Sequence, residues 1–260
     1  MCLLLIAVQH VPASPLLLLG NRDEFRGRPS LPAAPWTDTP EVVGGRDLVA
    51  GGSWLAIEGG GRYAAVTNLR NGLPATAPRS RGLLVGDYVR GSVSPDAFLA
   101  QVRAQIETYG PFNLIVGDAE GAWLLAGGSA AIHRLEPGVH VVSNGRFGTQ
   151  WPKTERLRRR FAEAVARADR SDDTLLALLA DTWQPPDEQL PDTGVGLAME
   201  RRLAPVFVQG EHYGTRASTL AAVDAAGIPR LAEVLWPGTG EPSPATRWRY
   251  EGTWVRDLPR

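Results

Sequence analysis

Two apolar runs open the chain, and the polar residues around them show where each run ends. The first is CLLLIAVQ and the second is SPLLLLG, with the polar segment QHVPAS between them. Each run suits a buried strand and is far shorter than the roughly 20 residues that a membrane helix needs. No basic segment precedes the first run, as a signal peptide would require. We therefore expect two neighbouring strands joined by a turn, in a cytoplasmic protein that does not insert into membranes.

Further strand-like runs follow in pairs. Residues 53–72 read as a hairpin, because three glycines separate two apolar segments. Residues 112–128 and 131–145 form two more hairpin-like units, with turns at Asp118–Gly121 and Glu136–Gly138. The last part of the chain, from residue 204 onward, is also rich in strand-like runs.

Residues 26–40 form a different kind of segment. The sequence RGRPSLPAAPWTDTP has too many prolines for a core element. It is long enough to act as a lid, but we expect an ordinary surface loop.

Helical spacing appears in two blocks. The first covers residues 79–91 and 94–110, where Ser94 is a candidate N-cap, Pro95 takes the first helical position and Gly110 ends the helix. The second block covers residues 154–168 and 172–183, and it includes the basic run KTERLRRRF (153–161), which we interpret as a solvent-facing helix surface. Strand pairs that alternate with helices favour antiparallel sheets covered by helices, in one domain.

Composition narrows the function classes. The 260 residues are 43% hydrophobic and 21% charged, with a formal net charge of −1, so we expect no nucleic-acid partner. The single cysteine, Cys2, excludes an internal disulfide. The four histidines are scattered without the spacing of a zinc site, and we expect no metal.

Cys2 is the candidate nucleophile. Removal of the initiator methionine would leave a cysteine with a free α-amine. An α-amino group has a pKa of about 7.7–8.0, so it can accept the thiol proton at neutral pH without a histidine. The alternative is a buried cysteine that acts as a small apolar side chain in its strand.

Other polar residues lie at or near strand ends, where side chains can line a cleft. Arg22 and Asp23 follow the second strand, Asn68 ends AVTN, and Asn144 ends VVSN. Arg216 lies inside the apolar segment YGTRAST. A thiolate acyl transfer needs a cation, a carboxylate to orient the amine, and amide donors for the oxyanion. The structural alternatives are turn-forming asparagines and an arginine in a buried ion pair.

Taken together, these motifs resemble the NRDE family, also called the transport and Golgi organisation family. The resemblance rests on the N-terminal MC, on two apolar strands followed by GNRDE, and on AVTNLR, VSNG and YGTRAST, and it covers nearly the whole chain. That family is more distantly similar to cysteine-type N-terminal nucleophile hydrolases such as penicillin V acylase, bile salt hydrolase and acid ceramidase. The resemblance implies an α+β fold with four layers, αββα, and cleavage of a non-peptide amide bond.

The resemblance also implies roles for particular residues. Cys2 matches the nucleophile, Arg22 the arginine that closes the second strand, and Asp23 the carboxylate that holds the amine. The remaining matches are an oxyanion donor, a second asparagine and a late arginine, which are Asn68, Asn144 and Arg216.

One departure concerns the carboxylate. In those hydrolases two residues separate the arginine from the aspartate, whereas Arg22 and Asp23 are adjacent. Neighbours along a regular strand face opposite ways. Either the strand ends at Gly20, or Glu24 rather than Asp23 shares a face with Arg22.

We therefore expect a cysteine amidohydrolase that acts on an amide or related acyl bond of a small molecule, through a thioester, without a cofactor. Members of the family have been linked to haem trafficking and to lipid or acyl-CoA handling. The alternative implied is a non-catalytic αββα carrier of haem or acyl-CoA, in which His212 would contact the iron. Nothing in the sequence supports a third possibility, a scaffold for secretory-pathway partners.

Overall fold

The strands pair into two antiparallel sheets. The computed structural model describes residues 2–72, 77–238 and 241–257, and within them each sheet has seven strands. Sheet A has the order β10 (Gly138–Val142), β1 (Cys2–Val11), β2 (Ser14–Phe25), β11 (Tyr213–Val223), β12 (Pro229–Leu235), β13 (Thr246–Tyr250) and β14 (Trp254–Asp257). Sheet B has the order β3 (Ser30–Trp36), β4 (Thr39–Asp47), β5 (Leu55–Glu58), β6 (Tyr63–Asn68), β7 (Phe112–Asp118), β8 (Gly121–Ala126) and β9 (Ala131–Leu135).

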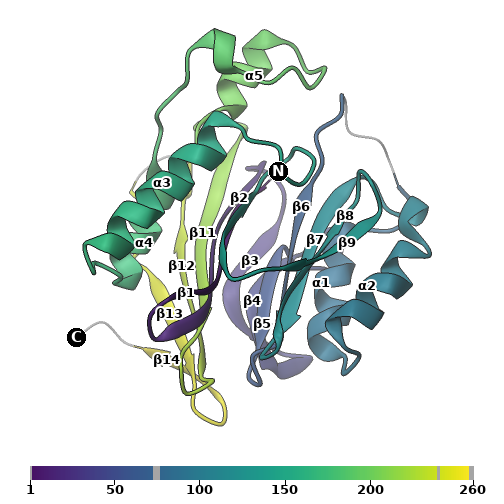
Figure 1. Ribbon diagram of the computed structural model, residues 1–260, viewed down its shortest axis with the longest axis vertical. Helices are drawn as coiled ribbons and strands as arrows, with labels where there is room; N and C mark the ends of the chain where they lie inside the picture. The colour runs from purple at the N-terminus through teal and green to yellow at the C-terminus, as the bar shows by residue number, and fades with distance from the viewer. Residues whose placement is uncertain (1, 73–76, 239–240, 258–260) are drawn as a thin grey trace.

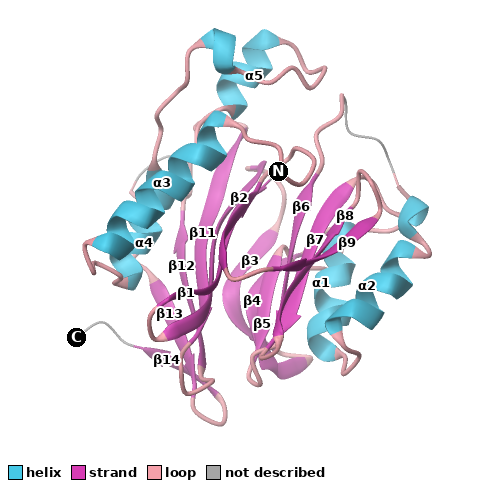
Figure 2. Cartoon of the chain, viewed as in Figure 1, coloured by secondary structure: helices cyan, strands magenta, loops and turns pink. Residues whose placement is uncertain are grey.

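Helices cover the outer face of each sheet (Figures 1 and 2). The helices are α1 (Arg81–Arg90) and α2 (Pro95–Arg103) on sheet B, α3 (Pro152–Ala166) and α4 (Asp172–Ala177) on sheet A, and α5 (Leu197–Leu203) above one end of the sandwich. Short 3₁₀ turns occupy Ile106–Thr108, Leu178–Ala180 and Asp187–Gln189. Separate apolar clusters fill the space between the sheets and the space between each sheet and its helices. The expected αββα arrangement is therefore confirmed.

The leucine run of β2 illustrates why sheet A forms. Leu16 and Leu18 belong to the cluster between the sheets, whereas Leu17 and Leu19 belong to the cluster under α3 and α4. A strand covered on both faces needs apolar residues at every position, unlike a half-exposed strand with alternating polarity. The uninterrupted run predicts this double burial, and both neighbours of β2 are strands, β1 and β11.

The proline-rich segment is not the loop that its composition predicts. Ser30–Trp36 forms β3 at the edge of sheet B, and its pairing with β4 is irregular next to both prolines. Proline lacks an N–H donor, so it is tolerated in an edge strand, where one row of backbone groups needs no partner. Most of the segment is therefore part of the sheet, and the expected surface loop is wrong.

Three further expectations are corrected. The unit at residues 131–145 is not a hairpin, because β9 pairs with β8 in sheet B and β10 pairs with β1 in sheet A. The helix that follows Ser94 ends at Arg103 and not at Gly110. Helix α5 lies in a stretch without a predicted element. Most other predicted strands and helices are present, with boundaries shifted by a few residues.

None of the helices in the described residues has the length and apolar character that crossing a bilayer requires.

Candidate functional site

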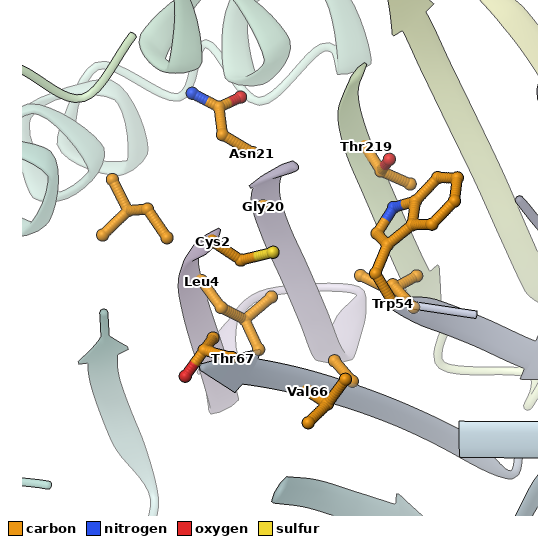
Figure 3. A pocket seen from close by; sticks show the side chains of 11 residues that line it. Cys2, Leu4, Gly20, Asn21, Trp54, Val66, Thr67 and Thr219 are labelled. Carbon is orange, nitrogen blue, oxygen red and sulfur yellow. The ribbon is translucent and has the colours of Figure 1, made fainter. Parts of the chain in front are cut away.

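Cys2 lies at the start of β1, directly across from the end of β2. The Cα of Cys2 pairs with that of Arg22. Two residues further along β1, Leu4 pairs with Gly20. Directly opposite residues share a face of the sheet, and Leu4 belongs to the cluster between the sheets. Cys2 and Arg22 therefore both face sheet B. Figure 3 shows the sulfur pointing into the space in front of Trp54, while Asn21 points away toward the helical layer.

A cavity opens at this end of the sandwich, which we call the Cys2 end. It encloses about 550 Å³, including space open to solvent. Strand ends from both sheets and the first turn of α1 supply its walls. The lining residues are Cys2, Arg22, Asp23, Glu24, Arg28, Asp47, Ser53, Trp54, Val66, Asn68, Ser80, Arg81 and Gly82.

Arg22 is held in place by acidic and aromatic neighbours from sheet B. Its Nη2 lies 3.4 Å from Oδ2 of Asp47, and its guanidinium carbon lies 4.5 Å from the centre of the Trp54 ring. Asp47 also pairs with Arg28, at 2.5 Å. Asp47 therefore neutralises only part of the charge of Arg22. The Arg22 side chain is 5% exposed and lines the cavity beside Cys2.

The strand geometry places the two candidate carboxylates, Asp23 and Glu24, on opposite faces of β2. Because β2 continues to Phe25, its residues alternate, and Glu24 lies on the same face as Arg22, with a side-chain separation of 3.9 Å. Asp23 faces the helical layer instead, where its Oδ1 accepts a hydrogen bond from the hydroxyl of Thr215 at 2.7 Å. Asp23 is nevertheless within electrostatic range of Cys2. In this antiparallel pair the backbone nitrogen of Cys2 lies on the side of the residue that follows Arg22, which is Asp23.

Burial shifts the pKa of both the Cys2 thiol and the Asp23 carboxyl. It raises the pKa of the Cys2 thiol, and the charge of Asp23 adds to this while Arg22 opposes it. Burial also raises the pKa of Asp23, which is 2% exposed, and the charge of Lys153 opposes that rise. The thiol is therefore protonated at neutral pH and needs a base before it can attack a carbonyl carbon.

The two asparagines occupy different places. Asn68 ends β6 and lines the cavity. Asn144 does not line it; the side chain is 1% exposed, and its Nδ2 donates to the backbone carbonyl of Asn68 at 2.8 Å. Asn144 thus positions the strand end that carries Asn68.

Arg216 lies at an irregularity in β11. Thr215 pairs with Asp23 and Ala217 pairs with Arg22, so Arg216 is an extra residue in the ladder, that is, a β-bulge. The bulge turns its side chain out of the apolar strand, and its guanidinium donates to the carbonyls of Phe25 and Arg28. Arg216 stabilises the turn that carries Arg28 and is not among the residues that line the cavity.

Besides Arg28, two further cations of this region are not among the residues predicted from the sequence. Arg81, the first residue of α1, lines the cavity. Lys153, in the first turn of α3, is 3% exposed although the basic run around it was expected to face solvent. A signal was present, since Leu157 and Phe161 follow Lys153 at intervals of four and both belong to the buried face of the helix.

His212 and metal binding have no support in this region. His212 lies in an exposed stretch before β11 and does not line the cavity at the Cys2 end. Within residues 2–72, 77–238 and 241–257, no group of three or more histidine, cysteine or acidic side chains is arranged to hold a metal ion.

Comparisons with known proteins agree on one family. A family model described as Transport and Golgi organisation 2 matches residues 1–236. The chain is 31% identical over 269 residues to a Transport and Golgi organization protein 2 homolog of Bos taurus, covering 95% of this chain and 96% of the relative. It is 33% identical to the Homo sapiens homolog, covering 87% and 90%.

Two solved structures are also similar. One is the Caenorhabditis elegans ortholog of N-acylethanolamine-hydrolyzing acid amidase, with a TM-score of 0.49, 10% identity, and coverage of 92% and 94%. The other is a mutant conjugated bile acid hydrolase from Clostridium perfringens, with a TM-score of 0.40, 9% identity, and coverage of 97% and 98%. Neither similarity bears on the chemistry of the site.

Proposed function

The chain belongs to the Transport and Golgi organisation 2 family, and we propose that this member is a cysteine amidohydrolase. It would cleave a non-peptide amide or related acyl bond of a small molecule through a thioester on Cys2, after removal of Met1. The observation that carries the proposal is the placement of Cys2. It is the first residue of β1, it shares a face with Arg22, and both line a cavity large enough for part of a small molecule.

The raised pKa of the Cys2 thiol defines what the base must do. In the processed chain the α-amine is attached to the same residue and accepts the proton of Sγ, which leaves a thiolate and an ammonium. Arg22 stabilises the thiolate, and Asp23, on the side of the backbone nitrogen, stabilises the ammonium.

The remaining steps conserve atoms and protons. The thiolate attacks the carbonyl carbon of the substrate. The oxyanion that forms is stabilised by polar groups of the cavity wall, among them Asn68. The tetrahedral intermediate expels the amine, which takes the proton of the ammonium, and a thioester remains. Water, deprotonated by the α-amine, then hydrolyses the thioester and regenerates Cys2.

The carrier alternative has less support. A haem site needs largely apolar walls and an axial ligand such as histidine, cysteine or methionine. Here the walls include three arginines and three carboxylates, and Cys2 is the one residue among those lining it that could serve as an axial ligand. The cavity does not fit a haem.

The test compares four proteins with mass-verified N-termini. They are the processed chain, a chain with an uncleaved N-terminal residue, Cys2→Ala and Cys2→Ser. Each is incubated with a panel of amides and acyl thioesters, and adducts and products are followed by intact mass and chromatography.

We expect full turnover in the processed chain, a reduced rate for Cys2→Ser, and none for Cys2→Ala or the extended chain. An extended chain has an amide in place of the α-amine, and an amide cannot accept a proton near neutral pH. Equal turnover by the extended and processed chains would exclude the mechanism.

A further inference from the structure

A second, smaller cavity lies beside Cys2, and the proposed steps do not use it. It measures about 250 Å³, with space open to solvent included, and Figure 3 shows the side chains that line it. We call it the inner compartment, and we call the larger cavity at the Cys2 end the polar cavity. The two share Cys2, Trp54 and Val66 as lining residues. The nucleophile therefore stands where the two spaces meet.

The wall that sheet A contributes to the inner compartment is a row of paired residues on three strands. Leu4 of β1 and Thr219 of β11 both pair with Gly20 of β2, and all three residues line the compartment. Leu4 faces sheet B, so this whole row faces sheet B. Because Gly20 has no side chain, the middle of the row is lower than its two ends. A Cβ at Gly20 would lie 3.0 Å from Cδ1 of Leu4, which shows how little further space this wall has.

The inner compartment is shallow. The next row toward the core consists of Ile6, Leu18 and Ala221, which pair with one another, are each 0% exposed and belong to the apolar cluster between the sheets. Successive rows on one face of a strand are two residues apart, so the space below the Cys2 row is about 7 Å deep, enough for a chain of about two to four carbons.

The walls of the inner compartment are suited to hydrocarbon. Sheet B contributes Leu55 and Ala65, which belong to the apolar cluster between the sheets. The hydroxyls that line the compartment donate elsewhere: that of Thr219 to Glu233 at 3.2 Å, and that of Thr67 to the carbonyl of Ser143 at 3.0 Å. An apolar group gains free energy when it leaves water for such walls, whereas a charged group loses its hydration there.

The polar cavity lies on the other side of the nucleophile and has the opposite character, since arginines and carboxylates line it. In the proposed steps the leaving amine takes its proton from the α-ammonium of Cys2. That nitrogen lies on the side of Asp23, which lines the polar cavity. A leaving group placed there receives the proton directly, and the acyl chain on the other side of the carbonyl carbon then points into the inner compartment.

We propose that the inner compartment is the acyl subsite of the Cys2 site and that it selects a short, unbranched acyl group of about two to four carbons. The leaving group in the polar cavity is then the larger and more polar part of the substrate. This inference rests on the proposed function, since it names the class of substrate for the same nucleophile.

The test uses a probe that needs no hydrolysis. Alkyl methanethiosulfonates with unbranched chains from methyl to octyl react with a thiolate: a disulfide forms, the bond between sulfur and the sulfonyl group breaks, and methanesulfinate leaves. In the adduct on Cys2 the second sulfur takes the place of the acyl carbonyl carbon, so the alkyl chain lies where the acyl chain would. Rates are followed by intact mass in the processed full-length chain, which has a single cysteine, and are divided by the rates of glutathione.

We expect a maximum at a short chain. The relative rate should rise by up to about fourfold for each methylene that enters the compartment, and it should fall by about tenfold between the best chain and octyl. Relative rates that are flat, or that rise steadily to octyl, would overturn the proposal. A thiol that reacts with none of the probes would also overturn it, because the compartment would then be closed to ligands.

Two variants should move the maximum in opposite directions. Leu4→Ala removes one end of the row and should favour hexyl over butyl about tenfold more than wild type does, whereas Gly20→Ala fills the middle and should favour methyl over butyl about fivefold more. Leu5→Ala is the matched control, because Leu5 is the next residue of the same strand, is equally buried, and belongs to the cluster under α3 and α4. An equal shift in Leu5→Ala would show that loosened packing, and not the compartment, sets the preference.

The wild-type profile stands by itself if a variant does not fold. The amide panel described above then separates the two proposals. A maximum at a short chain without hydrolysis of any amide would refute the hydrolase and leave the compartment as a binding site. Hydrolysis that is fastest for long-chain amides would support the hydrolase and overturn the acyl subsite.

Discussion

The two ends of the sandwich are built from contrasting side chains. At the Cys2 end, charged residues from both sheets surround a cavity open to solvent. At the opposite end lies the β13–β14 hairpin (Figure 1), which we call the hairpin end. Its aromatic residues belong to the apolar cluster between the sheets or pack against it; they are Trp248, Tyr250 and Trp254. Trp254 Nε1 donates to the carbonyl of Glu41 at 2.6 Å. The ring of Tyr250 lies so close to Gly59 that a Cβ there would come within 2.3 Å of it.

This difference separates stability from chemistry. Buried aromatic surface stabilises the fold without regard to pH. Buried charges such as Asp23 and Glu233 cost stability and make it depend on pH, but they can also control the protonation of a nucleophile. We therefore expect substitutions at the hairpin end to change the free energy of unfolding, and substitutions at the Cys2 end to change thiol reactivity.

The largest effect is expected for Trp254→Ala. The side chain is 6% exposed, so its removal leaves a cavity in the core and should cost about 3–5 kcal/mol of unfolding free energy, measured by urea denaturation. In the folded variant, alkylation of Cys2 should stay within about twofold of wild type, since the side-chain hydrogen bond of Trp254 is to Glu41, which does not line the cavity. Trp183→Ala, at a 40% exposed position, is the control and should cost below about 1 kcal/mol. A large fall in Cys2 reactivity would show that the two ends are coupled.

An intermediate effect is expected for Glu233→Gln, beside the Cys2 end. Glu233 is 2% exposed between the sheets, where it accepts hydrogen bonds from the backbone N–H of Ala33 at 2.7 Å and the hydroxyl of Thr219 at 3.2 Å. Burial raises its pKa from 4.5 to about 7. Between these values the folded chain binds a proton that the unfolded chain does not, so wild-type stability should fall as pH rises from 4.5 to above 7.

Glutamine keeps both contacts and removes the ionisation. At pH 8.5 the variant should be more stable than wild type by up to about 3 kcal/mol, whereas at pH 4.5 the two should differ little. Urea denaturation at both pH values measures this difference, with the exposed Glu188→Gln as control. If wild type and variant keep the same difference at both pH values, the pKa of Glu233 is not raised in the folded protein.

The smallest effect is expected for Arg22→Ala. Its guanidinium lowers the pKa of the Cys2 thiol, so its loss should raise the midpoint of the alkylation profile and slow alkylation at pH 7 by about three- to tenfold. Because burial already raises the pKa of this thiol, the profile must be measured to about pH 11 before the two rates converge. Arg46→Ala is the matched control: Arg46 lies 4.5 Å from the centre of the Trp36 ring and pairs with Asp38, but does not line the cavity. An equal slowing at every pH would mean that Arg22 only shapes the site.

Much of the fold could be predicted because it depends on local patterns. Apolar runs bounded by glycine and polar turns identified β1, β2 and the hairpins β5–β6 and β7–β8, and helical spacing identified α1 to α4. The candidate site residues Cys2 and Asn68 also lie at strand ends, as expected, and both line the cavity. A strand end is recognisable from sequence because the change from apolar to polar residues occurs where the chain leaves the core.

The tertiary structure alone decided which residues meet. The pattern of residues 131–145 shows two strands and a turn, but not that β9 and β10 pair with different sheets. It was likewise the continuation of β2 to Phe25, paired with β1 and β11, that turned Arg22 toward the cavity and Asp23 toward the helix-covered face of sheet A.

Contacts between distant segments also explain why the surroundings of Arg216 and Lys153 differ from those predicted. Arg216 leaves the apolar strand through a bulge, and Lys153 is buried because sheet A and α5 cover the first turn of α3. A local pattern records how polar each position is and which face of its own element it occupies. The partner strand, the register and the neighbouring charge come from segments far away in sequence. Those long-range contacts determine whether a charged side chain faces solvent or is buried beside Cys2.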